Sequence, residues 1–122
     1  MGAEIVGIAD GILTVRITGK LTQPELRAAQ NQMAASLQRQ SKTRILVLAE
    51  GFQGWAQGGD WGDLSFQMEN DPFIEKMAIV GEKKWEDLAL IFAAQGLRKF
   101  PVEYFQTADL VKARAWLATA SV

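Results

Sequence analysis

The run Ile45-Leu46-Val47-Leu48-Ala49 contains no polar residue that could mark a solvent-facing side. Branched apolar side chains favour a strand, and a strand with two apolar faces is buried on both sides. Such strands are typical of parallel sheets with helices packed on each face. We therefore predict a central strand over about residues 44–49 of an α/β domain.

Further segments have the patterns of strands and helices. Strands are expected over residues 4–9, 12–18, 77–80 and 102–105, and Asp10-Gly11 between the first two predicts a hairpin. Helices are expected from Thr22 to about residue 40, over 61–70, from 85 to 96, and after Thr107. The first helix begins with the capping-box pattern of Thr22 and Glu25. Strands separated by helices pair in parallel through right-handed crossovers, so all strands but the first should share one direction.

The composition excludes several classes of function. The 122 residues fit a single domain, 1–122, and 48% hydrophobic with 22% charged residues is ordinary for a globular protein. The net charge of −1 argues against a nucleic-acid partner. Because cysteine and histidine are both absent, thiol nucleophiles, Cys/His zinc sites and histidine acid–base catalysis are excluded. With no visible signal peptide or membrane-spanning run, we expect a cytoplasmic protein without a cofactor.

An aromatic, glycine-rich segment follows the central strand. Phe52, Trp55 and Trp61 lie there among four glycines, where a short polar turn would be usual. Glycine gives the backbone freedom but adds no apolar area. The three rings must therefore fold back onto the domain or contact another molecule, which indicates binding rather than catalysis.

The candidate binding site lies beyond the carboxyl ends of the strands, where open α/β sheets hold their ligands. Aromatic and lysine side chains are expected to converge there, and tryptophan and lysine both suit a membrane interface. We expect a lipid-like or other apolar ligand, with peripheral contact to the inner membrane surface through the loop 52–66. The candidate ligand-binding or membrane-binding residues are Phe52, Trp55, Trp61, Leu64, Phe66, Lys83, Lys84 and Trp85.

Ordinary core packing is the competing interpretation for several of these aromatics. Trp85 shares helical spacing with Leu88 and Phe92, which predicts one buried helix face. Phe52 and Trp55 have no periodic partner and are the stronger binding candidates. Exposed aromatics would also suit a homodimer or another protein–protein contact, because aromatics are enriched in interface cores.

A carboxylate enzyme is a third hypothesis. Asp60 and Asp63 are one helical turn apart and could hold Mg²⁺ or act as an acid–base pair. An aspartate at a helix start is more typically a cap and dipole partner. The glycines of residues 51–62 also lack the spacing of a phosphate-binding loop. We therefore expect neither catalytic residues nor a metal site.

Taken together, these segments resemble the SpoIIAA-like family of small stand-alone bacterial proteins in the STAS superfamily. The resemblance implies a βα superhelix with a mostly parallel sheet of about five strands, an N-terminal β-hairpin, four helices and a non-catalytic role. Relatives act as anti-sigma-factor antagonists, transporter tails or sensor modules, and lipid-like ligands have been suggested for such folds. The resemblance rests on Ile17-Thr18-Gly19-Lys20-Leu21-Thr22, Phe52-Gln53-Gly54-Trp55, Gly59-Asp60-Trp61-Gly62-Asp63-Leu64, Ala78-Ile79-Val80-Gly81 with Trp85, and Val102-Glu103-Tyr104-Phe105 ahead of Ala115-Trp116-Leu117.

One departure from the family pattern concerns regulation. Regulatory members carry a phosphorylatable Ser or Thr after Asp at the start of the helix that follows the central strand. Here that region reads Gly59-Asp60-Trp61 without a hydroxyl, and Ser65 has no preceding aspartate. A protein–protein role would therefore operate without the phosphorylation switch.

Overall fold

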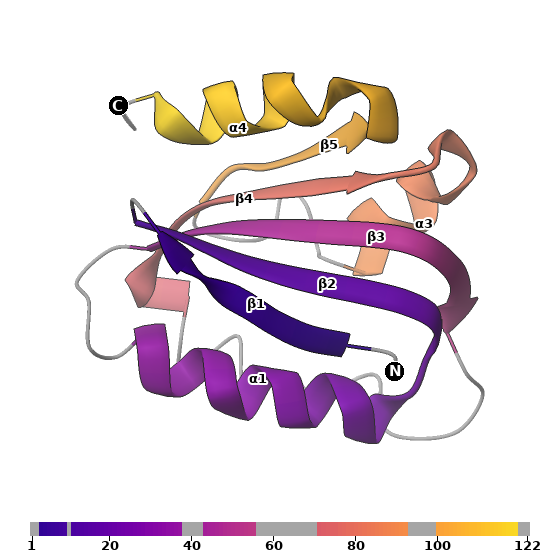
Figure 1. Ribbon diagram of the computed structural model, residues 1–122, viewed down its shortest axis with the longest axis horizontal. Coiled ribbons are helices and arrows are strands. Elements are labelled where there is room, and N and C mark those ends of the chain that lie inside the picture. Colours follow the sequence, from indigo (N-terminus) through magenta and orange to yellow (C-terminus); the bar gives the residue numbers. More distant parts are fainter. Residues whose placement is uncertain (1–2, 10, 38–42, 56–70, 93–99, 120–122) are drawn as a thin grey trace.

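The computed structural model describes residues 3–9, 11–37, 43–55, 71–92 and 100–119, which form one five-stranded sheet with helices on both faces (Figure 1). The strands lie side by side in the order of the chain. β1 is antiparallel to β2, and the other neighbouring pairs are parallel, which confirms the mostly parallel sheet. The strands are β1 (Ala3–Ala9), β2 (Ile12–Leu21), β3 (Thr43–Trp55), β4 (Ile74–Gly81) and β5 (Val102–Gln106).

Three α-helices are described: α1 (Gln23–Leu37), α3 (Glu86–Phe92) and α4 (Leu110–Ala118). Figure 1 shows α1 and α4 on opposite sides of the sheet. Short 3-10 turns precede β4, α3 and α4, at Asp71–Phe73, Lys83–Trp85 and Thr107–Asp109. The predicted helix over 61–70 lies outside the described residues, as does Asp10 of the predicted hairpin turn.

The start of α1 confirms the predicted capping box. The backbone N–H of Thr22 donates to Glu25 Oε1 over 3.1 Å, and the backbone N–H of Glu25 donates to Thr22 Oγ1 over 3.3 Å. These bonds satisfy donors that have no partner inside the helix. α1 is described as far as Leu37.

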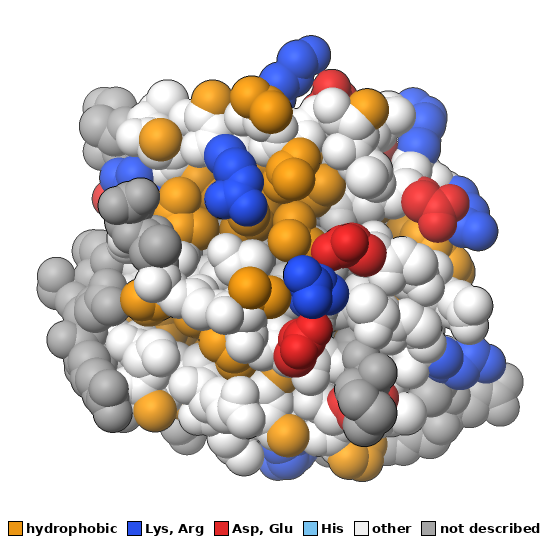
Figure 2. All heavy atoms as spheres, in the orientation of Figure 1, with side chains coloured by type: hydrophobic (Ala, Val, Ile, Leu, Met, Phe, Trp, Pro, Cys, Tyr) orange, Lys and Arg blue, Asp and Glu red, His pale blue; other side chains and the backbone are white. Residues whose placement is uncertain are grey.

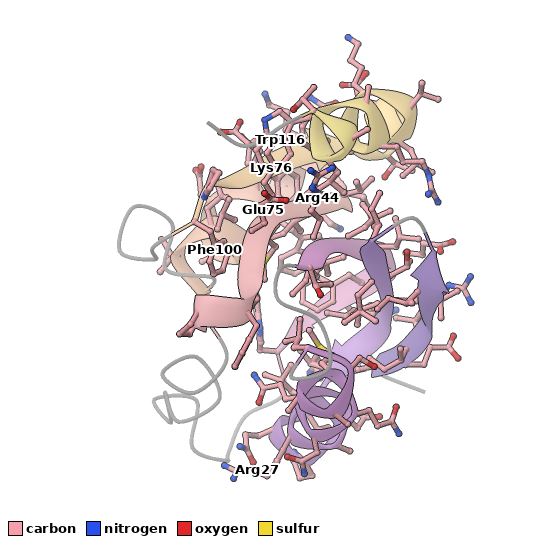
Figure 3. All side chains as sticks on the ribbon, turned by 90° about the vertical axis from the view of Figure 1, so that its left-hand side faces the viewer. Arg27, Arg44, Glu75, Lys76, Phe100 and Trp116 are labelled. Carbon is pink, nitrogen blue, oxygen red and sulfur yellow. The ribbon has the colours of Figure 1, made fainter. Side chains whose placement is uncertain are left out.

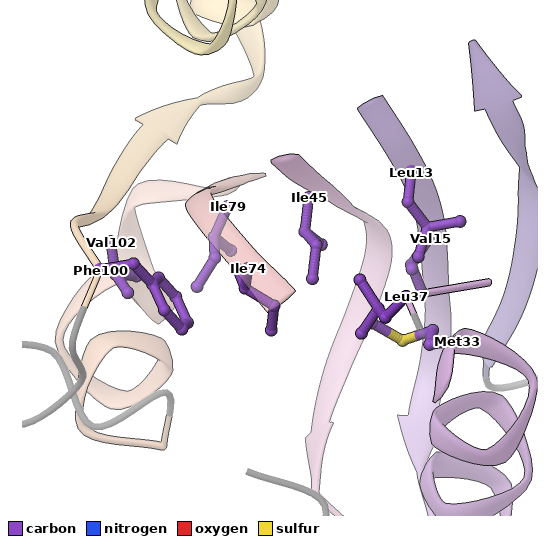
Figure 4. Close-up of a cluster of buried hydrophobic side chains, with 9 residues drawn as sticks. All are labelled: Leu13, Val15, Met33, Leu37, Ile45, Ile74, Ile79, Phe100 and Val102. Atoms are coloured by element: carbon purple, nitrogen blue, oxygen red, sulfur yellow. The ribbon is translucent and has the colours of Figure 1, made fainter. Parts of the chain in front are cut away.

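The larger core lies between the sheet and α1 and reaches α3 and β5 (Figure 4). Ile45 and Leu46 of β3 are both fully buried on opposite faces, which confirms the central strand. On β2 the residues alternate, so that Leu13 and Val15 face α1 while their neighbours face the other side. The buried members of this core are Leu13, Val15, Met33, Leu37, Ile45, Ile74, Ile79, Phe100 and Val102.

The second core lies under α4 and is closed by two basic residues from adjacent strands (Figure 3). Lys76 is only 4% exposed, and its ammonium donates to Trp116 O over 2.9 Å, Thr119 O over 3.0 Å and Thr119 Oγ1 over 2.6 Å. Arg44 donates to Leu117 O over 2.6 Å and to Glu75 Oε1 over 2.7 Å. The last carbonyls of a helix lack internal partners and carry its negative dipole end, so these cations satisfy and stabilise the end of α4.

The prediction that β3 ends near Ala49 and opens into a loop was wrong. β3 continues to Trp55 and stays paired with β2, with Gly19 opposite Phe52 and Leu21 opposite Trp55. The register shifts around these pairs, where Gly19 has φ 62°. Glycine tolerates such left-handed backbone, so it allows an irregular strand where it was taken to mark a loop.

The predicted buried face of the third helix was also partly wrong. Leu88, expected to be buried with Trp85, is 51% exposed. The residues that pack on the core are instead Ala89 and Leu90. Trp85 belongs to the 3-10 turn before α3, so it does not follow the spacing of the α-helix.

Candidate functional site

Three aromatic rings from two distant parts of the chain meet at the carboxyl-end edge of the sheet. Phe52 and Trp55 from the end of β3 contact Trp85 from the turn after β4. The ring centroids are 5.0 Å apart for Phe52–Trp55, 5.1 Å for Phe52–Trp85 and 6.1 Å for Trp55–Trp85, all in edge-to-face geometry. We call these residues the aromatic cluster. Phe52 is 6% exposed and packs against both tryptophans, which are half-buried.

Trp85 fixes the end of β3 by a hydrogen bond and by close packing. Its indole Nε1–H donates to the carbonyl oxygen of Phe52 over 3.0 Å. A Cβ placed on Gly54 would lie 3.2 Å from Trp85 Cη2, and Gly54 has φ 100°. Glycine is therefore needed at position 54 both for its backbone conformation and for the approach of the indole ring.

Basic residues border the aromatic cluster, but one of them is already paired. Lys84 Nζ lies 5.5 Å from the Trp85 ring centroid, within range of a cation–π contact. The same ammonium lies 3.9 Å from Glu82 Oε2. Both side chains are well exposed, so solvent screens this pair and leaves Lys84 able to exchange partners. Lys83 is exposed on the same turn.

Tyr104 is a polar residue at this edge that the sequence analysis did not single out. Its hydroxyl donates to the backbone carbonyl of Glu82 over 2.6 Å and occupies space that a Cβ on Gly81 would fill. Burial raises the pKa of Tyr104 to about 12, with smaller contributions from the carboxylates of Glu86 and Glu82. The only sequence signal was its place at the end of a strand on this edge.

Because Tyr104 is the only tyrosine, its ionisation can be followed directly by ultraviolet absorbance. We expect a phenolate midpoint near pH 12 in the folded protein and near pH 10 in concentrated guanidinium. The folded state holds this proton more tightly, so the stabilisation is complete below about pH 10 and is lost as the pH rises towards about 12. Equal midpoints in the folded and unfolded protein would contradict the described environment of Tyr104.

The structure thus brings together four of the eight predicted site residues: Phe52, Trp55, Lys84 and Trp85. Lys83 is nearby in sequence and exposed, with no described contact to the rings. The other three, Trp61, Leu64 and Phe66, lie outside the described residues. So do Asp60 and Asp63, on which the carboxylate-enzyme hypothesis depends.

The described ranges also bear on a membrane span and on a metal site. No helix among them is both long and apolar enough to cross a membrane. Nor do three or more acidic side chains gather in these ranges closely enough to hold a metal ion.

Comparison with known proteins identifies the family. The SpoIIAA-like family model matches residues 12–118, which is most of the chain. Among solved structures, the chain is similar to an uncharacterised protein with a SpoIIAA-like fold from Shewanella loihica, with a TM-score of 0.75 and 19% sequence identity over 96% of this chain and 94% of that one. No significant match is found among curated proteins. The match of the family model to residues 12–118 and the shared arrangement of the sheet and helices show that this chain belongs to the SpoIIAA-like family.

Proposed function

We propose that this protein is a non-enzymatic binding module that holds a lipid-like, apolar or amphipathic small molecule against the aromatic cluster. The observation that carries this proposal is the pair of half-buried tryptophans, Trp55 and Trp85, at the carboxyl ends of parallel strands. Ligand sites in open α/β sheets favour that edge, and they combine apolar walls with a few polar groups.

Each member of the site has a distinct role in this proposal. Trp55 and Trp85 supply two ring surfaces for an acyl chain or an aromatic group, and buried Phe52 holds them in place. Lys84, close to the Trp85 ring and paired with an exposed Glu82, is positioned for an anionic head group. The same side chains would allow peripheral contact with an anionic membrane surface, where each lysine contributes about 1 kcal/mol.

Binding of oleate tests the proposal, because oleate joins an apolar chain to an anionic head. We expect Trp55→Ala to weaken oleate binding at least about tenfold, which corresponds to about 1.4 kcal/mol of lost contact. Affinity would be measured by titration calorimetry. The matched control is Trp116→Ala, which removes a half-buried indole from α4 beside Phe105 and should leave the affinity unchanged.

Two results would contradict the proposal: equal oleate affinity of wild type and Trp55→Ala, or equal losses in both tryptophan variants. Vesicles containing anionic phospholipid, sedimented with the same three proteins, would show separately whether the site also acts at a membrane surface. Pelleting lost only in Trp55→Ala would assign the membrane contact to the aromatic cluster.

A second candidate function is a protein–protein regulatory module that uses this same edge, as a homodimer or with another partner. The observation in its favour is that α3, which directly follows Trp85, exposes Leu88 by 51% and Ile91 by 74%. These residues are three apart and share one side of the helix. A dimer of this kind would show a concentration-dependent mass by light scattering that is lost in Trp55→Asp.

A further inference from the structure

Part of one sheet face has no helix over it in the described part of the chain. α4 packs on the sheet through Ala113 and Leu117, against Leu46, Ala78 and Val80 of β3 and β4. On the same side of the sheet, β1 and β2 continue beyond α4 with no described helix above them (Figure 1). Sheet faces are normally covered by another layer, so this region is a candidate surface for binding a partner.

The uncovered region combines apolar side chains with a charged triad, Glu4, Arg16 and Glu50, that carries one excess negative charge. Ile12 and Leu48 are only partly buried at the border with α4. Beside them, Arg16 donates to Glu4 Oε1 and to Glu50 Oε1, each over 3.0 Å. Two half-exposed carboxylates on one guanidinium leave a net negative charge. Figure 2 shows apolar surface beneath α4, with a basic side chain lying over it and a row of acidic and basic side chains below it. We call Glu4, Ile12, Arg16, Leu48 and Glu50 the open sheet face.

The side of α4 that points away from the sheet complements the open sheet face, because it combines an apolar row with positive charge. Val111 is 79% exposed and shares this side with Ala115 and Ala118, which are also exposed. Their spacing of four and three residues places them in one row along the helix. Lys112 and Arg114 flank the row and are both exposed. We call these five residues the outer α4 face.

We propose that a second copy of this chain binds by placing its outer α4 face on the open sheet face. The row of Val111 and two alanines allows the helix to approach the apolar border closely, and the flanking cations meet the excess carboxylate charge. Each chain carries both surfaces, so two chains related by a two-fold axis form this contact twice. The assembly then closes as a dimer. This surface lies on the opposite side of the sheet from α3 and does not depend on the ligand site.

Sedimentation velocity of the full chain, from about 1 μM to about 1 mM, tests the proposal. We expect the wild-type mass to rise from 13.4 kDa towards twice that value. Val111→Glu should weaken the association at least tenfold, because it places a carboxylate against the acidic open sheet face. Ala35→Glu is the control, since it introduces the same charge at an exposed apolar position on α1, on the other side of the sheet, and should leave the association unchanged.

Exchanging the charges of Arg114 and Glu50 tests whether the outer α4 face of one chain contacts the open sheet face of the other. Arg114→Glu and Glu50→Arg should each weaken the dimer, and the combined variant should recover affinity relative to both. Circular dichroism would establish that all variants are folded. The proposal is overturned if wild type stays monomeric throughout, if Ala35→Glu disrupts the dimer as much as Val111→Glu, or if the combined variant shows no recovery.

Discussion

Lys76→Glu should release α4 from the sheet and lower the free energy of unfolding by more than about 3 kcal/mol. The wild-type ammonium is almost fully buried and is surrounded by two backbone carbonyls and a hydroxyl at the end of α4. A carboxylate there would face the carbonyl oxygens of Trp116 and Thr119 and the negative end of the helix dipole. Burial of such an uncompensated charge is among the most destabilising single changes.

Urea unfolding of Lys76→Glu and Lys112→Glu would isolate this effect. Lys112 is on the same helix and undergoes the same change of charge, but its side chain is 77% exposed. We expect the Lys112 variant to lie within about 0.5 kcal/mol of wild type, at concentrations where the protein is monomeric. Similar stabilities for the two variants would show that the ammonium of Lys76 does not hold α4 in place.

Gly54→Ala should destabilise the protein by about 2–3 kcal/mol and disturb the aromatic cluster. The new Cβ would lie 3.2 Å from Trp85 Cη2, and the residue would have to adopt φ 100°. The left-handed backbone alone costs about 1–2 kcal/mol for a residue with a side chain. The remainder comes from displacing Trp85, which also strains its hydrogen bond to the Phe52 carbonyl.

Gly51→Ala is the matched control for the contact with Trp85. Gly51 lies on the same strand with φ 61°, and a Cβ at this position would meet nothing within 4 Å. We therefore expect Gly51→Ala to lower the free energy of unfolding only by the backbone cost of about 1–2 kcal/mol. The near-ultraviolet circular dichroism of the aromatic cluster should stay unchanged. A stability for Gly54→Ala no lower than that of Gly51→Ala would contradict the tight packing of Trp85 on this strand.

Local patterns in the sequence were sufficient for much of the fold. Ile45 and Leu46 face opposite sides of the sheet and are both buried, as expected of a strand without a polar face. Thr22 and Glu25 cap α1 because both partners lie within one helical turn. These predictions succeeded because the interactions that decide them are close in sequence.

The continuation of β3 could not be predicted in the same way. Phe52 and Trp55 stay in the sheet because they pair with Gly19 and Leu21, more than thirty residues earlier in the chain. Glycines in this stretch suggested a loop, whereas here their left-handed conformations permit an irregular strand. The pairing partner, rather than local propensity, determines this element.

The aromatic cluster and the end of α4 show the same limit. Phe52 and Trp55 have no periodic partner in the sequence, and in the structure they contact each other and also Trp85, thirty or more residues later. Lys76 directly precedes the predicted strand 77–80, and its acceptors lie some forty residues away at the end of α4. A sequence pattern indicates which residues need a partner, but only the fold shows which partner they receive.

Mass spectrometry of small molecules extracted from natively purified protein is the most direct test of the proposed binding function. We predict that a lipid-like molecule co-purifies with wild type in near-stoichiometric amount and is absent from Trp55→Ala prepared in parallel. Trp116→Ala should retain it. Wild-type protein that carries no such molecule and binds no oleate would contradict the proposal that the aromatic cluster is a ligand site.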